Sequence, residues 1–429
     1  MANELALKGG TPVRTAPFPR WPIVGEAGRA ALLEVFDSGI WSFGGPREKE
    51  LARRWAELTG ARFAHCVSNG TVSLEIALRA LGIGPGDEVI VPALTWYGTA
   101  WAVQQVGAVP VFADVGDRDW CLEPAAVRAA VGPHTRAVIP VHLYDQVAEM
   151  DALLALASEL DLRIVEDCAH AHGSEWGGVG VGTLGDVGSF SFQQSKSMTS
   201  GEGGMLVTND EQLSREIYGL KNCGRPLGDG DHGFGGNQRI TEFQAAVLLP
   251  QLDRLEEQLD TRQANLEILR RGFAQVPGVS AREAKPRMTR QGLYGAGLRI
   301  DPKAFGGLPT ELIARSVQAE GVPIEKPYAV VYRAPAWKAG LTRIRVPAGQ
   351  RPERVLGLES VCPVAERISE QEGLVLLHHL LLGPERDTRD IVEAIAKVQA
   401  HAAELRLDSL QQKARGAAGS VLRRLGIKK

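Results

Sequence analysis

The sequence lacks the features that mark several large classes of protein. Its 429 residues contain only five cysteines, which lie far apart and form no C-x-x-C pair. An odd, scattered set of this kind argues for reduced thiols and against a disulfide framework or a zinc site. No run approaches the roughly 18 apolar residues of a membrane span, and the start of the chain has no apolar core of a secretory signal. We therefore expect a soluble, cytoplasmic protein with little membrane contact.

Net charge and phosphate-binding motifs are equally sparse. A formal net charge of -3 provides no basic field for nucleic acid, so we expect no nucleic-acid partner. The chain has no G-x-x-x-x-G-K-[ST] loop, and no G-x-G-x-x-G stands at an early strand–helix turn. These absences argue against a nucleotide P-loop and against a nicotinamide-dependent oxidoreductase on a Rossmann sheet. Basic residues gather only at the end of the chain, where a tail is predicted to be flexible, with a membrane-surface or partner helix as the alternative.

Apolar runs that alternate with helical stretches predict the fold. Strand-like runs occupy residues 63–68, 88–92, 109–115, 137–143, 162–168, 188–192 and 205–208. Helical stretches lie between them, for example at 71–81, 97–106 and 150–160. This alternation predicts an α/β fold, with a mostly parallel seven-stranded sheet flanked by helices on both faces. In such sheets ligands bind at the carboxyl ends of the strands.

The segments on either side of this pattern predict the domain organisation. Two helices come first, near 30–36 and 48–58, and the glycine-rich break between them is expected to expose two aromatic residues. A long helical stretch at 242–271 contains Pro250, which we expect to kink or divide it. We predict a large domain over 1–250, a smaller α+β domain over 251–405 and the basic tail over 406–429. Within the smaller domain, strands are expected near 293–300 and 343–346 and helices near 308–319 and 387–402.

One lysine in a run of small residues is the most informative chemical feature. Lys196 lies in GSFSFQQSKSMTSGEGG, between a strand-like run and a set of serines, a threonine and glycines. A lysine pressed into a ligand site loses its proton readily, and the neutral amine can attack a carbonyl to form a Schiff base. Taken alone, the segment fits a turn with a surface lysine equally well.

Two other strand ends carry residues suited to a ligand. Ser68-Asn-Gly-Thr71 joins a strand to a helix, and free amides at a helix N-terminus bind anions. Plain helix capping by Ser68 or Asn69 is the alternative. Trp96 follows another strand end, where its ring can stack on an aromatic ligand or pack in the core.

The segment VEDCAHAHG contains a buried acid. Asp167 ends an apolar strand, a costly place for a charge unless a cation such as a protonated ring nitrogen pairs with it. Capping of the next turn is the alternative. His170 and His172 suggest a metal, but no further ligands stand at the right spacing, so we predict no metal site. The glycine run at 176–182 opens no helix and is predicted to be a hairpin loop.

Taken in order, these features form a constellation. An anion-binding turn, an aromatic ring, a strand-end acid, and then Ser191 and Lys196 follow one another along the chain. A phosphate cradle, a stacking ring, a partner for a pyridine nitrogen and a Schiff-base lysine are what pyridoxal 5′-phosphate (PLP) requires.

The motifs SNGT, VIVPALTW, PVHLY, VEDCAHAHG, GDVGSFSFQQSK, GEGG and NQRITEFQAA carry a family resemblance. From about residue 9 to about residue 402 the chain resembles the DegT/StrS-type sugar aminotransferases, which have the fold-type-I architecture. The resemblance implies that Lys196 is the Schiff-base lysine and proton shuttle, and that Asp167 keeps the pyridine nitrogen protonated. It places His170 near the phenolic oxygen of the cofactor and Trp96 on its ring face.

The same resemblance assigns the remaining cofactor contacts. Gly70, Thr71 and Ser191 match phosphate contacts. Asn237 matches an asparagine that reaches the phosphate of the neighbouring subunit, which implies a homodimer with shared sites. Some relatives have a histidine in place of the lysine and are dehydratases, so Lys196 favours transamination.

Substrate assignments rest on resemblance alone. The QQSK context and the segment at 376–380 resemble L-glutamine:scyllo-inosose aminotransferases of aminocyclitol antibiotic pathways. This implies L-glutamine or L-glutamate as donor, a keto-cyclitol as acceptor, and substrate contacts by His142, Tyr144, His378 and His379. Asp145 follows PVHLY where relatives usually have glycine, so the acceptor could instead be another ketone, such as a nucleotide-linked keto-sugar. A noncatalytic binding protein that keeps the fold is the alternative from another class.

Overall fold

The computed structural model describes residues 4–230, 232–340 and 360–407. Its centre is a seven-stranded sheet with the order β1-β9-β8-β5-β4-β2-β3. The strands are β1 (Phe63–Val67), β2 (Glu88–Pro92), β3 (Val109–Ala113), β4 (Thr135–Val138), β5 (Arg163–Asp167), β8 (Val187–Ser191) and β9 (Gly204–Thr208). Only β9 is antiparallel to its neighbours; the other pairs are parallel. The predicted α/β fold with a mostly parallel sheet is confirmed.

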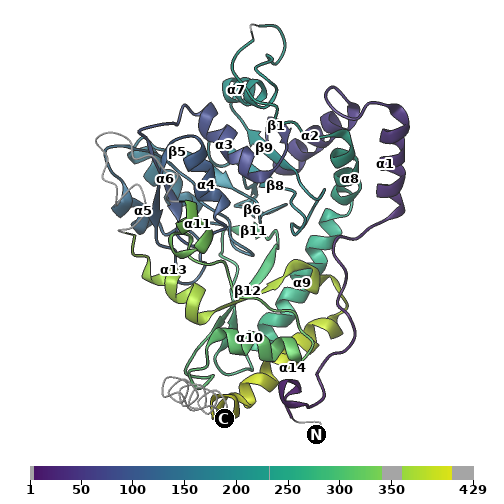
Figure 1. Ribbon diagram of the computed structural model, residues 1–429, viewed down its shortest axis with the longest axis vertical. Coiled ribbons are helices and arrows are strands. Elements are labelled where there is room, and N and C mark those ends of the chain that lie inside the picture. Colours follow the sequence, from purple (N-terminus) through teal and green to yellow (C-terminus); the bar gives the residue numbers. More distant parts are fainter. Residues whose placement is uncertain (1–3, 231, 341–359, 408–429) are drawn as a thin grey trace, which may run out of the picture.

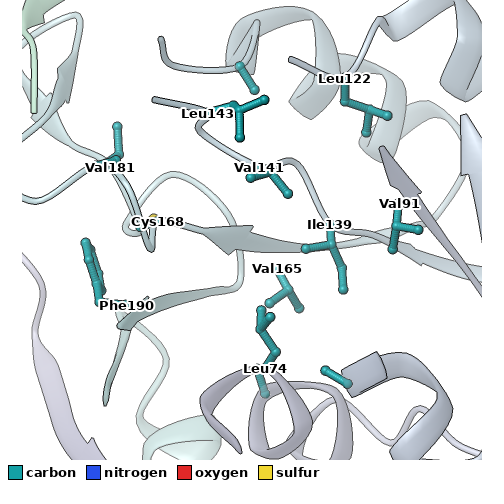
Figure 2. Packing of buried hydrophobic residues seen from close by; sticks show 14 of the residues in the cluster. Leu74, Val91, Leu122, Ile139, Val141, Leu143, Val165, Cys168, Val181 and Phe190 are labelled. Carbon is teal, nitrogen blue, oxygen red and sulfur yellow. The ribbon is translucent and has the colours of Figure 1, made fainter. Parts of the chain in front are cut away.

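Helices surround this sheet (Figure 1). They are α2 (Pro46–Thr59), α3 (Gly70–Ala80), α4 (Gly98–Gln105), α5 (Pro124–Ala130), α6 (Met150–Glu159) and α7 (Glu211–Lys221). Every residue of β2, β3, β8 and β9 is buried, because the sheet is covered on both faces. Figure 2 shows part of the core, in which Leu74 of α3 lies next to Val165 of β5. This packing explains why the strands are continuous apolar runs in the sequence.

A smaller antiparallel sheet forms a second layer. It contains β10 (Val279–Ala281), β12 (Gly295–Ile300) and β13 (Gly373–Leu377), with α10 (Thr310–Ala319) and α14 (Glu385–Ala400) nearby. Shorter elements complete the described chain: η1 (Ala6–Lys8), η2 (Val331–Arg333), α11 (Pro335–Gly340), α13 (Pro363–Arg367), η4 (Ile368–Glu372) and η5 (His378–Leu382). The predicted strand at 343–346, and the predicted tail from residue 408 onward, lie outside the described residues.

The long helical stretch at 242–271, which Pro250 was expected to kink or divide, is divided into two helices. α8 (Glu242–Leu252) contains Pro250 and ends two residues later, and α9 (Leu255–Phe273) continues toward the smaller sheet (Figure 1). Leu259 of α9 packs in the larger core, whereas Leu266 belongs to the second core. The two cores therefore meet along α9, and the domain division near residue 250 stays a prediction.

The loop after α1 and the glycine run at 176–182 adopt the structures predicted from the sequence. α1 (Glu26–Ser38) buries Ala31 and Val35 against α8, while Trp41 and Phe43 in the loop after it are about half exposed, as predicted. The glycine run forms a hairpin between β6 (Glu175–Trp176) and β7 (Val179–Gly180), also as predicted, and β11 (Met288–Arg290) pairs with β6. Each described helix is too short or too polar to span a bilayer.

Candidate active site

A cavity of about 780 Å³ opens at the carboxyl ends of the central strands. Residues of the large sheet and its helices line it, together with Tyr294, which directly precedes β12, and Tyr328, which lies in the loop before η2. The cavity brings together the predicted cofactor residues Gly70, Thr71, Trp96, Asp167, His170, Ser191 and Lys196. These residues span more than a hundred positions of sequence and meet because their strands end at the same edge.

Lys196 is buried in the wall of this cavity. Its Nζ lies 4.4 Å from the centre of the Tyr294 ring. Burial lowers the pKa of Lys196 to about 8, and the negative charge of Asp167 opposes that shift. The amine therefore gives up its proton more easily than a surface lysine does, as a nucleophile or proton carrier requires.

Asp167 is the last residue of β5 and is almost fully buried. Its Oδ2 accepts a hydrogen bond from Oγ1 of Thr99 (2.9 Å), and its Oδ1 accepts one from the amide of Ala169 (3.2 Å). Burial raises the pKa of Asp167 above its ordinary value, while these two hydrogen bonds act in the opposite direction. A carboxylate held in this way is suited to a cationic partner inside the cavity.

The N-terminus of α3 forms an anion cradle at the other end. Asn69 caps the helix by accepting from the amide of Val72 (2.9 Å), which confirms the capping alternative, while an anion site at the same turn stays a prediction. The first amides of a helix have no intrahelical acceptor, which leaves those of Gly70 and Thr71 for an anion. A Cβ on Gly70 would lie 2.7 Å from Cβ of Ser191, so only glycine allows α3 to approach β8 this closely.

A stack of rings forms the remaining wall. The Tyr144 amide donates to Nδ1 of His170 (3.2 Å), so Nε2 carries the hydrogen and donates it to the Tyr328 hydroxyl (3.1 Å). Burial lowers the pKa of His170 well below its ordinary value, which keeps the ring neutral. The ring of Tyr294 stacks on His170 at 3.8 Å between centres. Trp96 is 48% exposed and leaves a ring face open to the cavity.

Together these residues match a flat, phosphorylated cofactor with a basic ring nitrogen and a carbonyl group. The α3 amides suit its phosphate, the Asp167 carboxylate its ring nitrogen, the Trp96 ring its face and Lys196 its carbonyl. Sequence reasoning missed Thr99, Tyr294 and Tyr328. Thr99 had no distinctive motif, and Tyr294 and Tyr328 lie 98 and 132 positions beyond Lys196 in the chain.

Two predicted substrate residues do not face this cavity. His142 is fully buried; its Nδ1 accepts from the amide of Ala148 (3.1 Å), and its Nε2 donates to Glu166 (3.1 Å). Tyr144 adopts a left-handed backbone (φ 60°), and its hydroxyl accepts from the amide of Tyr328 (3.0 Å). The geometry therefore makes both residues supports of the cavity wall, and their expected contact with substrate stays a prediction.

The other predicted residues lie nearby but outside the cavity. His378 is fully buried and donates from Nε2 to the carbonyl of Ser195 (3.1 Å), beside Lys196, so it supports the lysine segment, and its expected contact with substrate stays a prediction. His379 is half-buried and lines a second cavity, which also touches Ser195. Asn237 is exposed on the surface of this single chain. Its expected role toward a neighbouring subunit stays a prediction.

Asp145 has a different role from the one expected. It is buried and forms an ion pair with Arg282, whose Cζ lies 4.2 Å from the centre of the Trp120 ring. The amide of Gly297 in β12 also donates to Asp145 (3.3 Å). This residue therefore joins the two halves of the chain, and its expected effect on the choice of acceptor stays a prediction.

His142, Glu166 and Cys168 lie close enough to suggest a metal site, with ligand atoms within 4.8 Å of one another. The Glu166 oxygens, however, already accept from the amides of residues 182, 184 and 185 and from His142. The cluster is thus a hydrogen-bonded support of the strand that carries Asp167.

The fold and the cavity place this chain among the fold-type-I aminotransferases. Comparison with known proteins agrees: the model of the DegT/DnrJ/EryC1/StrS aminotransferase family matches residues 22–385. The chain belongs to this family.

Its relatives are similar over nearly their whole length. A putative L-glutamine:3-amino-2,3-dideoxy-scyllo-inosose aminotransferase of Streptoalloteichus tenebrarius is 43% identical, over 95% of this chain and all of the relative. An L-glutamine:2-deoxy-scyllo-inosose aminotransferase of the same organism is 41% identical, again over 95% of this chain and all of the relative. The crystal structure of 3-amino-5-hydroxybenzoic acid synthase is similar with a TM-score of 0.81 and 34% identity, covering 90% of this chain and all of that one.

Proposed function

We propose that this protein is a PLP-dependent aminotransferase that moves an amino group from L-glutamine to a ketone on a cyclitol of the scyllo-inosose type, in aminocyclitol antibiotic biosynthesis. Relatives at 41–43% identity and full coverage, named for that donor and that kind of acceptor, support this proposal. L-glutamate as donor and a nucleotide-linked keto-sugar as acceptor are the competing choices.

The observation that carries the proposal is the placement of Lys196 and Asp167 in one buried cavity that ends at an anion cradle. The amides of Gly70 and Thr71 with Ser191 would hold the phosphate of PLP, and Asp167 would pair with its ring nitrogen. When bound, PLP supplies an electron-accepting ring to the carbon that bears the transferred amine.

The chain's own residues supply proton handling and orientation. Nζ of Lys196, with its pKa lowered to about 8, can take up and return a proton near neutral pH. The Tyr294 hydroxyl is 3.0 Å from Oγ of Ser195, which fixes the ring against which Lys196 lies. The Tyr328 hydroxyl accepts from His170, and its own hydrogen points to the Tyr294 hydroxyl, so the three side chains form one hydrogen-bonded chain along the cavity wall.

The test is product formation from defined substrates. The holoenzyme is incubated with L-glutamine and 2-deoxy-scyllo-inosose, and the aminocyclitol is detected by mass. L-glutamate and a nucleotide-linked keto-sugar serve as competing donor and acceptor. We expect the cyclitol to be aminated and Lys196→Ala to make no product, with the surface variant Lys326→Ala as the matched control. Preferential amination of the keto-sugar would overturn the acceptor assignment.

We also propose a homodimer with shared active sites. Large apolar side chains on α1 and the following loop are about half exposed, namely Leu33, Phe36, Ile40, Trp41 and Phe43. The guanidinium of Arg239, two residues after Asn237, lies 5.3 Å from the centre of the Phe43 ring. Asn237 therefore lies beside an apolar patch that a second copy can cover.

Mixing inactive variants tests this arrangement. If Lys196 of one subunit and Asn237 of the other serve the same site, each mixed dimer of Lys196→Ala and Asn237→Ala regains one intact site. A statistical mixture should then show about a quarter of wild-type activity. No recovery, in subunits shown to exchange, would contradict shared sites.

We further propose a reducing, cytoplasmic location. All five cysteines are free thiols, and four of them are buried.

A further inference from the structure

Arg262 is a buried cation without a counter-ion. This residue of α9 has no exposed surface. Its Nη2 donates to the side chain of Gln258 (3.2 Å), whereas its Nε and Nη1 have no hydrogen-bond partner. Among residues 4–230, 232–340 and 360–407, no carboxylate forms an ion pair with it. Burial lowers the pKa of Arg262 to about 9, so the guanidinium remains charged at neutral pH. A buried, uncompensated charge is strongly unfavourable and is normally paired.

The surroundings of Arg262 contain other buried polar atoms without partners. Its Cζ lies 5.7 Å from the centre of the Trp21 ring, whose Nε1 is buried without an acceptor. His378 meets the same indole edge-on at 4.5 Å between centres. Burial, followed by the charge of Arg262, lowers the pKa of His378 and of His379, so both rings are neutral; Nδ1 of His378 is a buried acceptor without a partner.

A second cavity approaches this region from the surface. It has a volume of about 680 Å³ and is lined by Trp21, His379, Ser195 and the exposed Arg20, among others. Its described lining includes no aspartate or glutamate. Such an entrance favours an anion over a cation.

We propose that Arg262, together with Nε1 of Trp21, holds a small monovalent anion between α9 and the N-terminal segment. The ligand is either an inorganic ion such as chloride or a carboxylate group of a substrate, since both satisfy a guanidinium and an indole N–H. The site lies behind the catalytic lysine, because His378, which contacts Trp21, donates to the carbonyl of Ser195. The proposal does not depend on which ketone the enzyme aminates.

Thermal unfolding of the holoenzyme in chloride and in methanesulfonate, which carries no carboxylate, tests the site at equal ionic strength. We expect chloride to raise the melting temperature of the wild type, because it binds the folded state. Arg262→Met should lose this dependence. Arg271→Met is the matched control, since Arg271 is on the same helix and its side chain is 72% exposed; it should keep the dependence.

A second measurement keeps the proposal testable if Arg262→Met fails to fold. Bromide soaked into wild-type crystals should give an anomalous peak within hydrogen-bonding distance of the Arg262 guanidinium if an inorganic anion is the ligand. If the ligand is a donor carboxylate, chloride should compete with L-glutamine, and Arg262→Met should raise the KM for L-glutamine but not for its decarboxylated analogue, 4-aminobutanamide. Two results would each overturn the proposal. The first is the absence of a bromide peak together with the absence of competition between chloride and L-glutamine. The second is an equal effect of chloride on the melting temperatures of the wild type and Arg262→Met; the site would then hold water only.

Discussion

Replacement of Asp167 by asparagine should raise the stability of the cofactor-free protein. The same change should lower the stability of the PLP-bound protein. Without PLP, the Asp167 carboxylate is buried and has two hydrogen-bond donors but no cation bound to it. Burial raises its pKa, so the folded protein binds this proton more tightly than the unfolded chain does. Below the pKa of Asp167 in the unfolded chain, this loss of stability is absent. It grows as the pH rises from that value to the pKa of Asp167 in the folded protein, and it is complete above the folded value.

The magnitude follows from the environment of the carboxylate. An incompletely compensated buried polar group costs about 1–3 kcal/mol. An unfolding entropy of about 2.1 cal/mol/K per residue converts this into a rise of roughly 1–4 °C in the melting temperature of the cofactor-free Asp167→Asn variant at pH 7. At a pH below the ordinary aspartate pKa the advantage should vanish. Asp260→Asn, an exposed change on α9, is the control and should leave the melting temperature unchanged.

With PLP bound, Asp167→Asn should lower the stability of the protein. Loss of a charge-assisted partner worth about 1.5–3 kcal/mol should weaken PLP binding about 10–150-fold. Turnover should fall on the order of 10²–10³-fold, as when one preorganised electrostatic partner is removed. The assays are thermal unfolding with and without PLP, titration of PLP and steady-state kinetics. A cofactor-free variant less stable than the wild type, or an unchanged PLP affinity, would refute the reasoning.

Three further predictions concern other parts of the site. Lys196→Ala should abolish turnover while the variant still folds, measured by product formation and circular dichroism; residual steady-state turnover would contradict its assigned role. Tyr328→Phe should lower kcat about 3–10-fold, the value of one hydrogen bond, and should lower the melting temperature by roughly 1–4 °C, because the buried His170 donor loses its acceptor; an unchanged kcat would remove Tyr328 from the account. Asp145→Ala should destabilise the protein by about 3–5 kcal/mol by leaving Arg282 buried and unpaired, measured by denaturant unfolding, and Arg282→Met in the same chain should recover much of the loss; equal instability of the double variant would argue against an ion-pair origin.

The sequence predicted the main sheet and the cofactor end of the site because both depend on local patterns. Buried parallel strands are continuous apolar runs, and the ends of the strands meet at one edge of the sheet. Asp167 and Lys196 could therefore be assigned to one site from the sequence. Gly70 and Thr71 were identifiable because a helix start after a strand is itself an anion site.

The residues at the substrate end of the site could not be predicted in the same way. Tyr294 and Tyr328 reach the cavity from loops in the second half of the chain, and no local pattern specifies that packing. His378 carried a family resemblance, but only the structure shows that its ring donates to the carbonyl of Ser195. The ion pair of Asp145 likewise depends on Arg282, which is 137 positions away.

The most direct test of the central claim is an absorbance spectrum of the purified protein before and after addition of L-glutamine. The account predicts a visible band of bound PLP that is lost as the cofactor accepts the amine, and no such response in Lys196→Ala. A band that responds to L-glutamate but not to L-glutamine would correct the donor. No band, even after PLP is added, would contradict the assignment of this cavity as an aminotransferase site.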